Sequence, residues 1–174
     1  MEAKNRPLSE VLMERREHLT EEWLARTLRS YPEATTRFLN QESDVFRNPV
    51  GHTFREGLER LFDGLAGNKD VSVMTSVLDS IIRIRAVQDF TASQAVSFVF
   101  LLKQVIREEL KDEVEPYSND LSALETRIDE LALLAFDLFM QCRQQIYEIR
   151  ADEARRRVSL LERCFQAAPS EPTR

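Results

Sequence analysis

The sequence predicts an all-α protein, and three observations support this prediction. Glycine occurs 4 times and proline 6 times in 174 residues, while helix-favouring Leu, Glu, Arg and Ala are abundant. Apolar residues recur at helical spacing along most of the chain, and capping residues stand in front of several of these segments. No segment alternates apolar and polar residues with the two-residue period of a strand. We therefore expect roughly six to eight helices and no sheet.

The composition limits the class of protein. Hydrophobic residues make up 43% of the chain, enough for a packed core, and the net charge is -6, with 30 acidic and 24 basic residues. This acidic balance argues against nucleic acid as the main partner. No apolar stretch has the length of a membrane span or the pattern of a signal peptide, and Cys142 and Cys164 do not make a disulfide framework. We therefore expect a cytoplasmic protein that binds no nucleic acid and does not insert into a membrane.

Two helices are expected at the amino end. Pro7 suits the first position of a helix. Thr20-Glu21-Glu22 in front of Trp23 is typical of a helix start, so we expect the second helix to begin there. Tyr31-Pro32 ends that helix, because the residue before a proline avoids the α region. A short helix is expected at 33–40 and a turn at 44–48.

The middle of the chain carries clear helix boundaries. Asn48 can cap a helix that Pro49 opens, and Gly51 in its first turn lets another backbone or a ligand approach closely. Gly67-Asn68 ends this helix, and Asp70 caps the next one.

The segment from Ile82 to Ala95 is typical of one helix end, a tight turn and a new helix start. Thr91 and Gln94 have the spacing of a capping box, and the helix that they open is expected to reach about Lys111. Few links between helices are this constrained in composition.

Two arginines, Arg83 and Arg85, stand in the last turn of the helix before this link, where cations interact well with the helix dipole. Asp79 lies four residues before Arg83, and Asp89 four residues after Arg85. We expect structural ion pairs, with contact to an anion or to a partner protein as the alternative.

The last helix is expected to be unusually long. Ser122 and Glu125 have the spacing of a capping box, and apolar or small residues then recur at 3-4 spacing up to Ile149. After Ile149 the register changes to a second stripe, made of Ala151, Ala154, Val158, Leu161 and Phe165.

A helix of roughly 45 residues, about 65 Å long, exceeds what a compact domain can cover. We therefore expect it to project and to pair with a second copy in a homodimer; the alternative is a monomer in which it folds back as the last core helix. The residues expected in the dimer interface are Leu121, Leu124, Ile128, Leu131, Leu138, Cys142, Gln145 and Ile149.

Residues that could carry catalysis or hold a metal are scarce. The chain has two histidines, His18 and His52, and lacks a phosphate-binding glycine loop, a nucleophile elbow and a C-x-x-C motif. A metal site needs three or four clustered ligands. We therefore expect no enzymatic activity, no metal and no cofactor.

The two motif segments outline a candidate ligand pocket. An aromatic lining with a few polar groups suits a small apolar ligand, and its arginine could take an anion. The alternative is a close-packed corner of the core, in which these residues are structural. The expected lining residues are Phe46, Asn48, Val50, Phe54, Ile84, Arg85, Val87, Gln88, Phe90 and Phe98.

The same two segments resemble the amino-terminal sensor domain of RsbR-type co-antagonist proteins, the stressosome family. The residues that carry the resemblance are Asp44, Phe46, Asn48-Pro49-Val50-Gly51 and the run from Ile82 to Ala95. It extends over about residues 8–150, so we expect a sensor domain at 1–150, followed at 151–174 by the continuation of the last helix and a tail.

The resemblance implies a globin-like helical fold without haem, which acts as a dimer in the bacterial cytoplasm and passes a signal through its long last helix. In the family that helix leads into a STAS domain, for which a chain ending at Arg174 has no room. We therefore expect a regulatory sensor module that acts alone on an unidentified signalling protein. Two alternatives are a haem-binding gas or redox sensor, whose proximal histidine is missing from residues 91–111, and a structural coiled-coil adaptor.

Overall fold

The fold is known from a computed structural model, which describes residues 6–31, 36, 48–88, 90–111 and 114–167, with side chains up to residue 163. These residues contain helices and no strand, which confirms the all-α prediction. The expected short helix at 33–40 and the turn at 44–47 lie outside the described residues, apart from Thr36. The helices are α1 (Leu8–Glu14), α2 (Arg16–Leu28), α4 (Pro49–Ala66), α5 (Thr75–Val87), α6 (Ala92–Leu110) and α7 (Ser118–Ala167), with 3-10 turns η1 (Val71–Met74) and η3 (Glu115–Tyr117).

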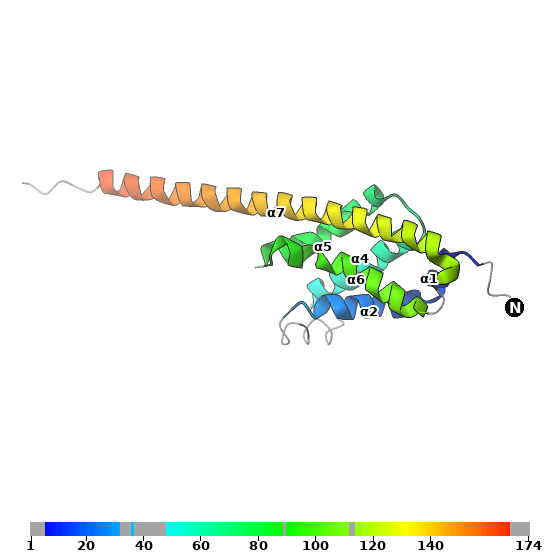
Figure 1. The fold of residues 1–174 in the computed structure, drawn as a ribbon. Helices are drawn as coiled ribbons and strands as arrows, with labels where there is room; N and C mark the ends of the chain where they lie inside the picture. Colours follow the sequence, from blue (N-terminus) through cyan, green and yellow to red (C-terminus); the bar gives the residue numbers. More distant parts are fainter. Residues whose placement is uncertain (1–5, 32–35, 37–47, 89, 112–113, 168–174) are drawn as a thin grey trace, which may run out of the picture.

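The shorter helices form a body beneath the first half of α7 (Figure 1). Helix α7 packs along α5 and α6, α2 packs on α6 and α4, and α4 packs on α5. The second half of α7 extends beyond the body toward the carboxyl end (Figure 1). The hydrophobic core therefore lies among α2, α4, α5, α6 and the first half of α7. None of the described helices has an apolar stretch long enough to cross a membrane.

Trp23 joins α2 to α6 at the centre of this core. Its side chain is fully buried, and its indole N–H donates a hydrogen bond to the carbonyl oxygen of Phe98 at 2.7 Å. The two rings stack with their centres 6.3 Å apart. A buried indole needs such an acceptor, so the contact fixes how far along α6 the second helix lies.

The boundary between α1 and α2 differs from the prediction. Helix α2 begins at Arg16 and runs through Thr20, whose hydroxyl donates back to the carbonyl oxygen of Arg16 at 2.9 Å instead of capping a new helix. Leu19 and Trp23, on either side, are both buried on the same helix face. Continuous packing of this face outweighs the local capping signal, so the predicted start at Thr20 is wrong.

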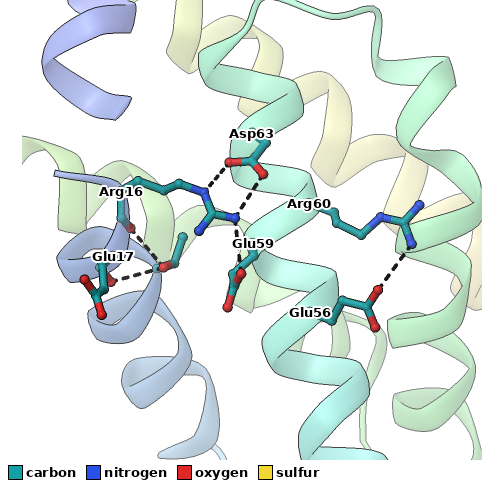
Figure 2. A network of polar contacts seen from close by, with 7 residues as sticks. Arg16, Glu17, Glu56, Glu59, Arg60 and Asp63 are labelled. Carbon is teal, nitrogen blue, oxygen red and sulfur yellow. Dashed lines mark hydrogen bonds and ion pairs between the residues drawn. The ribbon is translucent and has the colours of Figure 1, made fainter. Parts of the chain in front are cut away.

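A polar network ties the start of α2 to α4 (Figure 2). The guanidinium of Arg16 donates to Asp63 at 2.6 and 3.0 Å and to Glu59 at 3.1 Å, and Arg60 pairs with Glu56 at 3.8 Å along α4. The hydrogen bonds to Asp63 are the main reason why the pKa of Arg16 is raised. Arg16, Glu59 and Asp63 are about one-third exposed, and Arg60 and Glu56 are more than half exposed, so each pair contributes only about 0–1 kcal/mol. The network mainly orients the two helices.

The predicted capping box at the start of α6 is confirmed. The N–H of Gln94 donates to the hydroxyl of Thr91 at 3.3 Å, and the N–H of Thr91 donates to the side-chain oxygen of Gln94 at 3.0 Å. Helix α4 also ends where expected, at Ala66, and Asn68 follows it with a φ of 53°.

Helix α7 contains 50 residues, which corresponds to about 75 Å, and confirms the prediction of one long last helix. It begins at Ser118, directly after η3, so the capping box predicted at Ser122 and Glu125 is wrong. Glu125 instead pairs with Arg107 of α6 at 2.5 Å.

Candidate functional site

The side chain of Arg85 lies wholly inside the body, at the corner where α5 ends and α6 begins. It is 0% exposed, although arginine has one of the most polar side chains. Its guanidinium carbon lies 4.6 Å from the ring centre of Phe90, 5.3 Å from that of Tyr31 and 5.5 Å from that of Phe98. Aromatic rings attract a cation at this range, so the charge is held inside a cage of three rings.

Hydrogen bonds satisfy only part of this guanidinium. Nη2 donates to the carbonyl oxygen of Gln94 at 2.9 Å and to the hydroxyl of Ser30 at 3.2 Å, and Nη1 lies 3.4 Å from the hydroxyl of Tyr31. Among the described residues no carboxylate pairs with Arg85. Two buried atoms at this corner, Nε of Arg85 and Oε1 of Gln88, have no hydrogen-bond partner.

The energetics of this corner are finely balanced. Burial lowers the pKa of Arg85 and raises that of Tyr31. Burying an ion costs several kcal/mol. Each ring contact returns about 0.5–2 kcal/mol and each hydrogen bond from a charged donor about 1.5–3 kcal/mol. The cage can therefore hold a charged arginine, and the N–H of Nε is the part that nothing in the described chain compensates.

Asn48 caps α4 as predicted. Its side-chain oxygen accepts a hydrogen bond from the N–H of Gly51 at 2.8 Å, and the residue is 2% exposed. The space above Gly51 is occupied by the side chain of Asn48. The close approach that this glycine permits is therefore that of its own capping residue.

The residues predicted to line a pocket have different surroundings. The side chain of Arg85 fills the space between the rings, and Val87 is 68% exposed, so it faces solvent instead of the core. Phe46 lies outside the described residues. Ligand binding at this corner stays a prediction. The other predicted residues are buried or half-buried at this corner, in α6 or at the start of α4: Asn48, Val50, Phe54, Ile84, Gln88, Phe90 and Phe98.

Most residues predicted for a dimer interface are already covered by their own chain. Six of the eight predicted residues are each at most 9% exposed, because this face of α7 packs on α5 and α6. They leave little surface for a second copy, while Gln145 and Ile149 lie further along α7 and are exposed; the dimer interface stays a prediction. The six covered residues are Leu121, Leu124, Ile128, Leu131, Leu138 and Cys142.

A different face of α7 carries a second apolar stripe, which we call the outer stripe. Its large side chains are between 45% and 68% exposed. The register change at Ile149 is therefore the point where the core-facing side ends and the outer side continues on one uninterrupted helix. Extending the register of residues 151–165 backwards in steps of seven reaches Tyr147, Met140 and Leu133, so this part of the stripe follows from the sequence alone. The outer stripe consists of Leu133, Phe136, Met140, Tyr147, Ala151, Ala154, Val158 and Leu161.

Arg143 connects the Arg85 corner to α7. Its Nη1 donates to the carbonyl oxygen of Ala86 at 3.2 Å, which closes the carboxyl end of α5, and its Nη2 donates to the hydroxyl of Tyr147 at 2.9 Å. Ala86 directly follows Arg85. The end of α5 and the part of α7 that leaves the body are thus joined by one side chain.

Both histidines lie on the surface. His18 is next to Glu109 and His52 next to Glu56, each at 3.2 Å. Neither imidazole reaches the core. Within the described ranges, no group of three His, Cys, Asp or Glu side chains is arranged to hold a metal ion.

A groove of about 210 Å³ lies between α1, α4 and α7. Its largest polar group is the guanidinium of Arg127, which donates to the carbonyl oxygens of Leu65 at 2.6 Å, Gly64 at 3.4 Å and Lys69. These bonds close the carboxyl end of α4. Arg127 in this groove therefore holds the end of α4 against α7.

Comparison with known families matches most of the chain to a family model. The family model described as the RsbT co-antagonist protein rsbRD N-terminal domain matches residues 17–156. The match includes both motif segments and α7 up to the first turns of its projecting part. Comparison with curated proteins found no match. Comparison with solved structures found none either.

Proposed function

The chain belongs to the family of RsbT co-antagonist protein rsbRD N-terminal domains, and we propose that it acts as a non-enzymatic sensor module of the RsbR type. In this proposal the helical body receives the signal and α7 carries it to a signalling protein in the cytoplasm. The shape supports this division, because α7 is a core helix in its first half and a free helix in its second (Figure 1). The globin-like order of the helices stays a prediction.

The observation that carries the proposal is the outer stripe. It begins over the body, at Leu133, and continues in the projecting part to Leu161 without a break in the helix. A row of exposed apolar residues at 3-4 spacing on one helix is the pattern of a coiled coil. We infer that a second copy covers it, because a two-fold axis makes one stripe complementary to itself.

Charges beside the outer stripe favour a parallel pair. With Val158 and Leu161 at the a and d positions, Arg143 and Arg157 are at g, and Glu148 and Glu162 are at e. In a parallel pair, g of one helix faces e of the next heptad in the other, which brings each of these arginines opposite one of these glutamates. Between these two pairs, the same geometry places Arg150 of one helix opposite Arg155 of the other, which is a repulsion. An antiparallel pair would bring the g arginines together, so it would be less stable.

The link through Arg143 supports a route for the signal. A change at the Arg85 corner would move the carbonyl oxygen of Ala86, to which Arg143 donates. Since the same guanidinium lies 5.0 Å from the ring centre of Tyr147, in the outer stripe, the change would reach the proposed interface over a short distance.

Sedimentation equilibrium tests the proposed dimer. We compare the full chain with the double variant Val158→Asp/Leu161→Asp, which places charges in the outer stripe. The matched control is Leu160→Asp, since Leu160 is 56% exposed on the same helix but lies off the stripe.

We expect the full chain and the control to sediment as dimers, and the double variant as a monomer of 20.3 kDa. A full chain that stays monomeric at micromolar concentration overturns the proposed dimer. If all three proteins dimerise alike, the outer stripe is not the interface.

A further inference from the structure

We propose that the buried edge of the Arg85 guanidinium, at the α5–α6 corner, is a binding site for a small oxyanion, of the class of carboxylates, bicarbonate and phosphate. The inference deepens the proposed function by naming the chemistry of a ligand. Ligand binding is measured by a method that does not depend on whether the protein dimerises.

The rings and hydrogen bonds around the Arg85 guanidinium leave one of its nitrogen atoms for a ligand. Tyr31, Phe90 and Phe98 surround the guanidinium with their ring centres 4.6–5.5 Å from its central carbon. Nη2 is engaged by the carbonyl oxygen of Gln94 and the hydroxyl of Ser30. Nε is the guanidinium nitrogen that has no hydrogen-bond partner.

An oxyanion is the ligand class that this edge recognises. A guanidinium edge presents its N–H groups in one plane, which matches the in-plane lone pairs of a carboxylate, bicarbonate or phosphate oxygen. A negative charge would also compensate the buried cation, for which the described residues provide no carboxylate. A neutral ligand would satisfy the hydrogen bond but not the charge.

Gln88 lies at the same place, where its amide N–H groups, but not its Oε1, can donate to an oxyanion. Its side-chain Oε1 is buried and unpartnered, and its side chain interacts with the hydroxyl of Tyr31, which also lies 3.4 Å from Nη1 of Arg85. The amide and the guanidinium thus meet at one hydroxyl group. Gln88 and Phe90 are each partly exposed, so the site lies one side chain below the surface.

The Nε–H resonance of Arg85 in the nitrogen-15-labelled full chain reports binding directly. We titrate sodium acetate, bicarbonate and phosphate separately, with sodium chloride at matched ionic strength as the reference. The three salts distinguish which member of the class is preferred. The Nε–H resonance of Arg83 is the internal control, because Arg83 is exposed on the same helix and already paired with Asp79 at 2.6 Å.

We expect a saturable shift of the Arg85 resonance with at least one oxyanion, no saturable shift with chloride, and no matching change at Arg83. Gln88→Glu should weaken binding about tenfold, because it places a carboxylate beside the guanidinium, where it competes with the oxyanion. Arg85→Met should abolish binding and identifies the resonance. Gln88 is partly exposed, so Gln88→Glu remains informative if Arg85→Met does not fold.

The proposal is overturned if the Arg85 resonance does not saturate with any of the three oxyanions, which would mean that the aromatic cage alone compensates the cation. It is also overturned if Arg85 and Arg83 shift alike, which would show a general salt effect. Dimerisation through the outer stripe can hold or fail independently of both outcomes.

Discussion

Gly51 and Asn48 share one space at the start of α4. A Cβ atom at Gly51 would lie 2.2 Å from the side-chain nitrogen of Asn48 and 2.7 Å from its side-chain oxygen, which accepts the N–H of Gly51. The cap folds over the first turn of the helix, where only a glycine leaves room for it. The two residues therefore act as a unit.

The substitution Gly51→Ala should destabilise the protein by about 1–3 kcal/mol, although alanine is the better helix former by roughly 1 kcal/mol. The added methyl group has to displace the Asn48 cap, which is itself worth about 0.5–2 kcal/mol. Urea unfolding of Gly51→Ala, Asn48→Ala and the double variant measures this. In the Asn48→Ala background we expect the cost of Gly51→Ala to disappear; strictly additive costs would contradict the shared space.

Removing the guanidinium of Arg143 should loosen the end of α5. Arg143→Met loses the hydrogen bond to the carbonyl oxygen of Ala86, and we expect a cost of about 1 kcal/mol and faster amide hydrogen exchange in the last turn of α5. The measurement is made in the Val158→Asp/Leu161→Asp background, so that dimer contacts do not contribute.

Arg150→Met is the control for this substitution, since Arg150 lies seven residues further along α7 and is exposed beyond the body. Equal exchange rates at the end of α5 in the two variants would show that Arg143 does not hold α5.

The pKa of the Cys142 thiol is raised, mainly because the side chain is buried. The folded protein thus keeps the thiol protonated at a pH where the unfolded chain begins to ionise it. Its contribution to stability is therefore present at neutral pH and is lost as the pH rises above the ordinary thiol pKa. In a Cys164→Ser background, we expect Cys142 to react with a thiol reagent at least about tenfold more slowly in the folded protein than in urea. Equal rates would mean that the thiol is accessible.

Much of the fold follows from local sequence signals. The caps at Asn48 and Thr91 and the helix end at Gly67 were predictable, because each depends on a few neighbouring residues. The predicted starts at Thr20 and Ser122 were wrong, because packing on the core carries both helices through those positions.

The candidate site was predictable only in part. The sequence singled out Arg85 and indicated an ion pair with Asp89, which lies outside the described residues. It did not indicate the cage, because residues as distant as Tyr31 and Phe98 leave no local pattern. For α7 the heptad spacing was visible, but periodicity alone does not tell which of two apolar faces the body covers. The packing of α7 on α5 and α6 decides this.

Exchanging charges beside the outer stripe should reveal the direction of the pair. In the proposed parallel dimer Arg157 of one copy faces Glu162 of the other, twice by symmetry. Arg157→Glu or Glu162→Arg alone replaces both attractions by repulsions, and we expect each to weaken dimerisation by about 1–2 kcal/mol, roughly five- to thirtyfold in the dissociation constant. The double variant Arg157→Glu/Glu162→Arg restores opposite charges and should regain most of the affinity. Sedimentation equilibrium at low salt measures all four proteins, and circular dichroism confirms that each remains helical, since Arg157 also pairs with Glu153 in its own helix. Tighter dimerisation of Arg157→Glu would contradict the parallel arrangement, because only an antiparallel pair brings the g arginines together.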